Sequence, residues 1–538
     1  MAALALAAPA AAQVVLDRAD PAVIERDLNR AEALQPATPR PEVRTQAEAV
    51  AQSQIRVAPG AVIVESTIFA NSDFTAAVGP YLGRSLGADE LKELLASIAG
   101  VARDRGFLFA TASIAPQAVS AGVLRVTLDE GRIDAVRSLG RPNAQVDAIL
   151  RRLVGTGPVR RSEFERALLI AGDVAGVRVT DARYVRQNGF GILLVTVADD
   201  RASFAAQLDN RGSEIVGPER ATGVAAVRGV IGEGDEVSVL GAGTPFHPGE
   251  LIFAQLKYSA ALNDRGTLLW SSASVGHTHP GGSLAPFNVT GDSYALATGL
   301  SHPFIRSRKA SVWSTVSFKG LWLDQDILGV RVRRDRIVTA AAELDGAAEI
   351  AGGVVRGNAS AVIGLPLAGV THAGDPLASR GDGDARLGLF QFYGDWTREV
   401  GHNLSIRAAG IAQTATRPLL ASQELGLGGR LFGRAYDENE RSGETGVAGS
   451  FEARLSLPAR GSGAIRRVQV YAFADAGYVG NARQGLGGGA LYSAGGGLRL
   501  GIGRSFDGEA EIATPLGADR LGTGNRKPRV SFRLSARW

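Results

Sequence analysis

The last ten residues of the chain alternate without exception between polar and apolar side chains. Successive side chains on a β-strand point to opposite faces, so this pattern predicts one strand with one polar and one apolar face. The polar face carries Arg529, Arg533 and Arg537, which face lipid only at a large energetic cost. We therefore assign the polar face to a watery interior and the apolar face to lipid, as in the strands of a membrane β-barrel.

Comparable alternation recurs from Phe204 to the end of the chain, between turns rich in Gly, Asp, Asn and Pro. Residues 251–259, 449–455 and 468–479 are examples. No run of about 18 apolar residues follows the N-terminus, which argues against membrane-spanning helices and leaves a closed barrel as the other way to cross a bilayer. About 335 residues, at roughly 20 per strand and loop, predict on the order of 16 antiparallel strands over residues 201–538.

One glycine-rich segment, at about residues 425–446, interrupts this alternation. Its glycines, Gly433 among them, permit conformations and close approaches that a side chain forbids. Arg434 and Tyr436 are its large side chains. This composition predicts a loop that folds inward and is anchored there, rather than an exposed tip.

The strand expected over residues 468–479 offers a partner for that loop. Phe473, Asp475 and Gly477 share the parity that faces the interior if the apolar parity meets lipid. A buried carboxylate needs a partner, and an arginine can supply a two-pronged, charge-assisted one. We therefore expect Asp475 to point inward, where an arginine of the loop can pair with it.

Two tripeptides, Arg-Ala-Tyr at 434–436 and Phe-Ala-Asp at 473–475, make the chain resemble the outer-membrane translocators of two-partner secretion. This is the haemolysin secretion/activation family, typified by ShlB, FhaC and HecB. The resemblance implies a 16-stranded barrel with a folded-in loop, whose tip arginine pairs with the aspartate on the wall. Ala435 stands where the family usually has glycine. The resemblance therefore does not define the backbone conformation of the tip, although the charged pair is retained.

The front half contains an internal repeat of about 70 residues, over 60–131 and 132–200. Each copy reads β-α-α-β-β, with helical spacing of apolar residues at 88–105 in the first. The order resembles POTRA domains, whose sheet edge can accept an extended peptide as a further strand. Two α+β domains with a scaffold role only are the alternative.

The first 59 residues divide into three expected parts. Residues 1–12 resemble the remnant of a secretory signal, without a basic start; either translation begins upstream or this is an alanine-rich leader. Residues 13–34 predict a short helix with Asp20 as its cap and Pro21 in its first turn. Residues 35–59 contain spaced prolines and predict an extended linker. This region is either a disordered tail or, as the resemblance implies, a helix that plugs the pore.

Composition excludes several classes of function. The chain has no cysteine and six histidines, and we find no Ser/His or Asp/His catalytic arrangement and no phosphate-binding loop. The net charge is +4 without a long basic run, which argues against nucleic-acid binding. We expect neither an enzyme nor a cofactor or metal site.

The aromatic end of the last strand resembles the signal by which outer-membrane barrels are delivered to the barrel-assembly machinery. Trp538 is the terminal residue of that signal and Phe532 lies on the same apolar face.

These patterns together predict periplasmic α+β repeats followed by a barrel in the outer membrane of a Gram-negative bacterium. The resemblance implies export, through the barrel, of a secreted exoprotein that carries an N-terminal secretion domain. A barrel-assembly insertase and a passive porin are the alternatives. The Arg434–Asp475 pair either stiffens the barrel only or holds the loop in a secretion-competent position.

Overall fold

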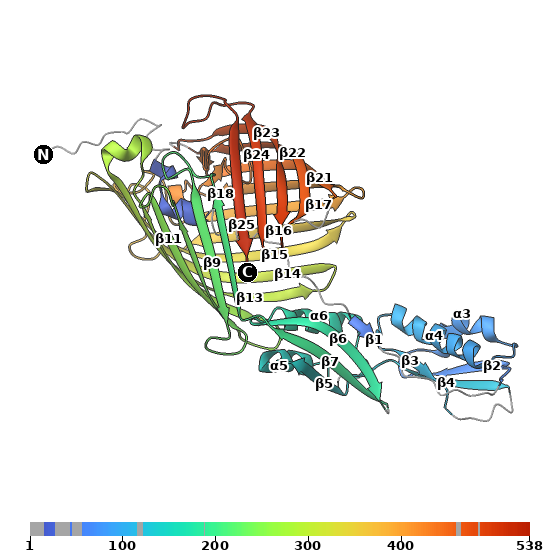
Figure 1. Cartoon of the computed structure of the whole chain (residues 1–538). Coiled ribbons are helices and arrows are strands. Elements are labelled where there is room, and N and C mark those ends of the chain that lie inside the picture. The colour runs from blue at the N-terminus through green and yellow to red at the C-terminus, as the bar shows by residue number, and fades with distance from the viewer. Residues whose placement is uncertain are drawn as a thin grey trace.

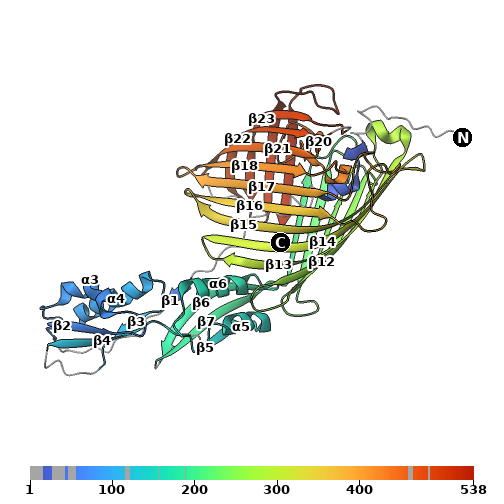
Figure 2. The ribbon, with the colours of Figure 1, turned by 180° about the vertical axis from the view of Figure 1, so that it is seen from behind.

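Two α+β units extend from one end of a closed β-barrel in the computed structural model (Figures 1 and 2). We call that end of the barrel the domain end and the opposite one the loop end. The expected fold class is confirmed. The structure describes residues 16–26, 43–45, 56–115, 122–155, 157–187, 189–458, 464–482 and 485–538.

The first unit packs helix α4 on a three-stranded sheet of order β2-β4-β3. Helix α4 buries Leu94, Leu95 and Ile98 at the spacing of one helix face. The first strand after α4 is confined to Thr111–Ser113, because residues 107–110 turn and bury Phe107. The elements are β2 (Ala61–Glu65), η1 (Asn71–Phe74), α3 (Thr75–Val78), η2 (Gly79–Tyr81), α4 (Ala88–Asp104), β3 (Thr111–Ser113) and β4 (Val123–Asp129).

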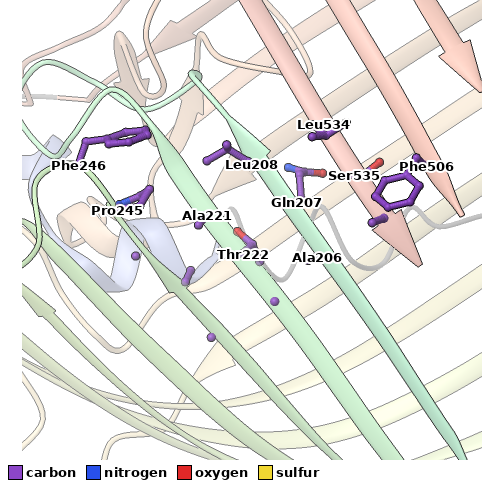
Figure 3. A pocket seen from close by; sticks show the side chains of 15 residues that line it. Ala206, Gln207, Leu208, Ala221, Thr222, Pro245, Phe246, Phe506, Leu534 and Ser535 are labelled. Atoms are coloured by element: carbon purple, nitrogen blue, oxygen red, sulfur yellow. The ribbon is translucent and has the colours of Figure 1, made fainter. Parts of the chain in front are cut away.

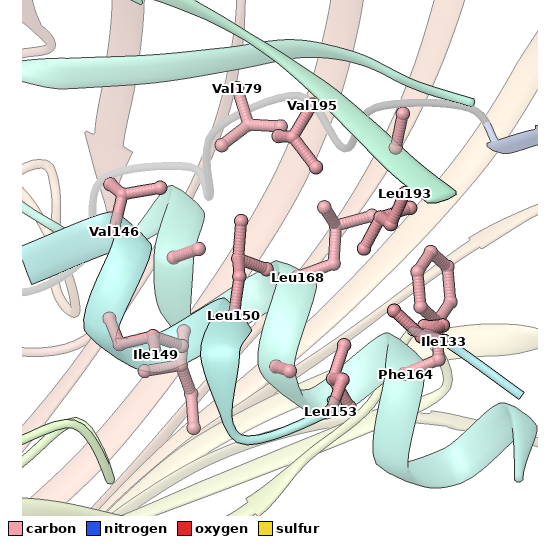
Figure 4. Close-up of a cluster of buried hydrophobic side chains, with 14 of the residues drawn as sticks. Ile133, Val146, Ile149, Leu150, Leu153, Phe164, Leu168, Val179, Leu193 and Val195 are labelled. Carbon is pink, nitrogen blue, oxygen red and sulfur yellow. The ribbon is translucent and has the colours of Figure 1, made fainter. Parts of the chain in front are cut away.

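The second unit has a four-stranded sheet of order β1-β6-β7-β5, covered by two helices. Figure 4 shows its apolar core, in which Leu150 and Leu168 of the helices face Val195 of the sheet. Strand β1 comes from the expected linker and pairs in parallel with β6. The elements are β1 (Val43–Thr45), β5 (Ala135–Gly140), α5 (Ala144–Arg151), α6 (Arg161–Gly172), β6 (Val177–Gln187) and β7 (Phe190–Asp199).

The barrel has 16 strands, each antiparallel to its neighbours, and closes between the last strand, β25, and the first, β8. The closing seam pairs Arg533–Arg537 with residues 205–209. The strands are β8 (Ala202–Asp209), β9 (Arg220–Arg228), β10 (Asp235–Gly243), β11 (Leu251–Ala261), β12 (Leu268–Thr278), β13 (Val289–Arg306), β14 (Ala310–Ile327), β15 (Val330–Ile350), β16 (Gly353–Gly364), β17 (Gly388–Glu399), β18 (Leu404–Ala415), β21 (Thr445–Leu457), β22 (Ile465–Gly480), β23 (Gly489–Ile502), β24 (Phe506–Pro515) and β25 (Arg529–Arg537).

Alternation assigns the two faces of the wall. Apolar side chains such as Phe392, Phe451 and Val530 are more than half exposed on the outside, while Glu452 and Asp475 are buried on the inside. This is the arrangement expected of a barrel with a lipid-facing exterior. Among the described residues, none of the helices is both long and apolar enough to span a membrane.

The second unit is fastened to the domain end of the barrel. Arg166 of α6 donates to the carbonyl oxygens of Pro303 and Phe304, at 2.6 and 3.1 Å. Arg306 forms a two-pronged ion pair with Asp173. These contacts fix the direction in which the sheet of the second unit leaves the barrel.

Residues 16–26 lie inside the loop end of the barrel, as the dark-blue helical turns in Figures 1 and 2 show. They are helical at 16–18 and 21–26 and largely buried. Of the helix expected over residues 13–34, only this part is described. The expected leader, residues 1–12, lies outside the described residues.

Candidate functional site in the barrel lumen

The connection between β18 and β21, residues 416–444, enters the lumen from the loop end, and we call it the long loop. Its stem is a two-stranded hairpin of β19 (Leu425–Leu427) and β20 (Arg441–Gly443). The tip turns through Gly428, Gly429 and Gly433, whose positive φ angles disfavour residues with side chains. The glycine-rich composition therefore produces the inward fold.

Arg434 at the loop tip contacts Asp475 of β22. Its Nε and Nη2 donate to the two carboxylate oxygens at 3.1 and 3.0 Å, and its backbone N–H donates to Oδ2 at 3.1 Å. The side chains are 6% and 0% exposed. The structure thus joins the two residues that the sequence paired, in the fork geometry that binds a carboxylate most specifically.

The neighbouring strand β21 and Phe473 of β22 complete the seat of Arg434. Its Nη1 donates to Glu452 at 2.8 Å and its Nη2 to the hydroxyl of Ser450 at 3.0 Å. Its guanidinium carbon lies 3.4 Å from the ring centroid of Phe473. Burial alone lowers the pKa of Arg434, but the hydrogen bonds and charges of Asp475 and the other carboxylates outweigh burial and hold the pKa above its usual value.

Tyr436 and the two glycines shape the space around the pair. Tyr436 is fully buried, and its hydroxyl donates to the carbonyl of Ala518 at 3.0 Å. A β-carbon at Gly433 would lie 3.3 Å from the backbone of Gly428, and one at Gly477 would lie 3.0 Å from Leu427 of the long loop. Both glycines therefore allow the loop to pack closely.

Sequence reasoning missed several residues of this network. Arg499 donates to Glu452 at 2.7 Å and to Glu509 at 2.8 Å, and Tyr471 donates to Glu511 at 2.8 Å. All five side chains belong to the inward parity of their strands, so alternation was an available signal. Their pairing was not, because it depends on the register between strands.

Residues 16–26 are held between this loop and the opposite wall. Arg18 pairs with Asp437 of the long loop at 3.2 Å, and Asp17 pairs with Arg333 of β15 at 2.6 Å. Glu25 pairs with Lys319 of β14 at 3.0 Å. The segment therefore bridges the long loop and the wall by ion pairs at both ends.

The middle of the segment packs against wall positions that lack side chains. A β-carbon at Gly276 or Gly291 would lie 3.1 Å from the ring of Pro21. Asp20 caps the helical turn by accepting from the N–H of Ala22 at 2.8 Å, and its second oxygen has no hydrogen bond in the described chain. Burial, together with the nearby carboxylates of Asp335 and Asp17, raises the pKa of Asp20 to about 7.

The expected assembly signal lies at the domain end. Trp538 is exposed, stacks on Phe204 with ring centroids 5.4 Å apart, and meets Phe506 edge-on. Phe532 faces outward on the same strand. The aromatic residues therefore sit on the outer surface beside the closing seam.

Two hollows are notable in the barrel. One, of about 510 Å³, lies in the lumen and is lined by charged side chains such as Arg430, Arg434, Glu509 and Arg533. The other, of about 540 Å³, lies along the closing seam, where small and apolar side chains such as Ala206 and Leu534 line it (Figure 3). In the described part of the chain, no three His, Asp or Glu side chains are grouped to hold a metal ion.

Family models match both halves of the chain. Residues 191–500 match the family described as haemolysin secretion/activation protein ShlB/FhaC/HecB. Residues 58–131, the first unit, match the POTRA domain of ShlB type.

A curated relative is the heme/hemopexin transporter protein HuxB of Haemophilus influenzae strain 86-028NP, 26% identical over 268 residues. The match covers 48% of this chain and 47% of HuxB, so the chain aligns with about half of that relative's length.

Solved structures share the whole fold. CdiB from Escherichia coli has a TM-score of 0.70 at 18% identity, covering 97% of this chain and 98% of CdiB. CdiB from Acinetobacter baumannii has a TM-score of 0.64 at 16% identity, covering 98% and 99%. BamA from Haemophilus ducreyi lacking POTRA domains 1–3 has a TM-score of 0.56 at 12% identity, covering 90% and 100%.

Proposed function

Because the chain belongs to the haemolysin secretion/activation family ShlB/FhaC/HecB, we propose that it exports a partner exoprotein through its barrel in two-partner secretion. The barrel lies in the outer membrane, with the two α+β units in the periplasm. The domain end is thus periplasmic and the loop end extracellular. The proposed cargo is a large secreted protein of the haemolysin or adhesin type, with an N-terminal secretion domain.

One observation carries the proposal: a polar lumen is occupied by a short terminal segment that is not part of the wall. Residues 16–26 are attached to the wall through side-chain contacts, including the ion pairs of Asp17 and Glu25 and the bond from Thr278 to the carbonyl of Ala19. A segment bound in this way can leave without unfolding any strand. We propose that it plugs the resting pore and is displaced during export.

The periplasmic units offer a route into the lumen. Strands β2 and β3 form the two edges of the first sheet, and an extended cargo segment can add to such an edge through main-chain hydrogen bonds. The attachment of α6 to the end of β13 keeps the second unit beside the barrel mouth. We propose that the units capture the secretion domain there.

The Arg434–Asp475 pair is proposed to hold the long loop in the position that export requires. Its support is the depth of the seat: removal of either partner leaves a buried charge without compensation. We also propose that Trp538, with Phe532, is read by the barrel-assembly machinery, since both face the outer surface of β25 and Trp538 lies at its periplasmic end.

The test is to co-express the chain with the exoprotein of a neighbouring gene and to assay that protein in the medium. We expect secretion that requires the chain and that is lost when residues 60–199 are deleted. Retained export without those residues would favour a passive porin. Defective insertion of other outer-membrane proteins, with normal exoprotein export in the absence of the chain, would favour an assembly insertase.

A further inference from the structure

A second extracellular loop, between β16 and β17, also folds into the barrel, and we call residues 365–387 the side loop. It covers the part of β15 that rises above the end of β16. The N–H of Arg334 donates to the carbonyl of Leu377 at 2.6 Å, and the N–H of Ser379 donates to Asp335 at 3.0 Å. The side loop is therefore fixed to the wall just before its residue Arg380.

Arg380 reaches across to the base of the long loop. Its Nη1 lies 2.8 Å from Oε1 of Glu424 and 2.5 Å from Oε1 of Glu444. Glu424 directly precedes β19, and Glu444 directly follows β20. One guanidinium thus joins both chain ends of the hairpin stem.

This junction is buried and held by ion pairs, while Nε of Arg380 and Oε1 of Glu444 have no hydrogen bond in the described chain. The side chains of Arg380, Glu424 and Glu444 are 3%, 2% and 5% exposed. The second oxygen of Glu424 accepts from the hydroxyl of Ser442 at 2.7 Å, and that of Glu444 accepts from the N–H of Ala482 at 3.0 Å. Because both carboxylates are out of water, neither strand of the stem can shift without leaving a buried charge unpaired.

The two buried arginines hold opposite ends of one element. Arg434 lies on the long loop and binds the wall, whereas Arg380 lies outside the long loop and binds its base. The tip could be released while the base stays closed, or the reverse. The geometry separates the two events.

We propose that Arg380 is a positioning residue that clamps the base of the long loop, independently of Arg434 at the tip, and so keeps the extracellular mouth closed around the stem. This rests on the proposed function only in that the mouth is the exit of an export pore. Opening of the mouth is then controlled by the side loop as well as by the long loop.

Thiol labelling tests the clamp without any cargo, because the natural chain has no cysteine. Ser422 is the probe: it is 3% exposed, lies next to the base, and its hydroxyl has no hydrogen bond in the described chain. In Ser422→Cys cells, a membrane-impermeant maleimide is added from outside. Arg380→Gln should speed labelling by at least about tenfold, the effect of one charged hydrogen bond.

The matched control is Arg386→Gln, in the same loop, because the Arg386 side chain is 46% exposed and pairs with Asp384. It should leave the rate unchanged. Arg380→Lys retains a charge but cannot bind two carboxylates with separate N–H groups of a planar guanidinium. The cysteine at position 422 should therefore be labelled at an intermediate rate in this variant. Glu444→Gln removes the other side of the contact and should behave like Arg380→Gln, which gives a second route if Arg380→Gln fails to fold.

Arg434→Gln tests whether the clamp at the base is independent of the contact at the loop tip. It should leave labelling at position 422 near the natural rate, while export, measured separately, falls. An unchanged rate in both Arg380→Gln and Glu444→Gln would overturn the clamp. Labelling in Arg434→Gln as fast as in Arg380→Gln would overturn its independence. Export that fails to occur at all would refute the proposed function and leave these labelling results intact.

Discussion

The long loop and residues 16–26 both occupy the lumen, but they are held there differently. The loop tip meets the wall through Arg434, whose donors reach Asp475, Glu452 and Ser450. The segment also has ion pairs at its ends, but between them Pro21 packs against two glycines of the wall and Asp20 is buried with one oxygen lacking a hydrogen bond in the described chain. The difference indicates that the loop is built to remain in place and the segment to leave.

The largest expected effect comes from breaking the loop seat. Arg434→Ala and Asp475→Ala each leave a buried charge, a cost of about 3–5 kcal/mol, so exoprotein in the medium should fall by about a hundredfold or more. Arg526→Ala, at an exposed ion pair, is the control. Heat-dependent gel mobility reports barrel folding. Normal export by a folded Arg434→Ala or Asp475→Ala protein would remove the loop-seat hypothesis.

Evicting the segment should have the next largest effect. Ala22 packs in an apolar cluster with Ala295 and Leu323. Ala22→Glu would bury an unpaired charge there, which should shift the docking equilibrium by about a hundredfold and raise channel conductance in planar bilayers. Ala22→Ser is the matched neutral variant and should stay near the natural level. Equal conductance of the natural and Ala22→Glu chains would mean that the segment does not limit the pore.

Docking of the segment should weaken as the pH rises. The pKa of Asp20 is about 7 when docked and 3.8 when free, so the docked state holds an extra proton between these values. By linkage, docking is strongest below about pH 4, weakens up to about pH 7 and changes little above that. Channel activity should increase roughly tenfold or more from pH 5 to pH 7. Asp20→Asn should flatten the profile; the same pH response in that variant would assign it to another group.

The smallest effect is expected at Tyr436. Tyr436→Phe keeps the packing and removes one hydrogen bond to Ala518, about 1 kcal/mol, so labelling of a cysteine introduced at Ala435 should rise only about fivefold. Tyr478→Phe, at an outward-facing tyrosine, is the control. A hundredfold rise in Tyr436→Phe would show that the tip depends on Tyr436 rather than on Arg434.

Patterns within contiguous stretches of sequence were sufficient to predict the barrel and part of the candidate site. Alternation assigned the inward faces of β22 and β25, and glycine content marked the long loop, because both signals lie in contiguous sequence. Asp475 could be paired with Arg434 because the two tripeptides that contain them resemble the family's motifs.

Other features depend on contacts between distant segments, which no local pattern encodes. Arg380 stands in an irregular loop, and its partners, Glu424 and Glu444, are brought to it by the fold. Strand β1 has three residues, too few for an alternating signal, and exists because β6 offers an edge. The seat of Pro21 depends on glycines in β12 and β13.

The most direct measurement tethers each element in turn. In the cysteine-free chain, one cysteine pair at Ala22 and Ala295 joins the segment to the wall, and another at Ala435 and Ala513 joins the loop tip to it; each pair shares an apolar cluster. The pairs are closed by oxidation or a short thiol crosslinker, and export is assayed. We predict that the first tether stops export and the second does not. Continued export with the segment tethered would contradict the account.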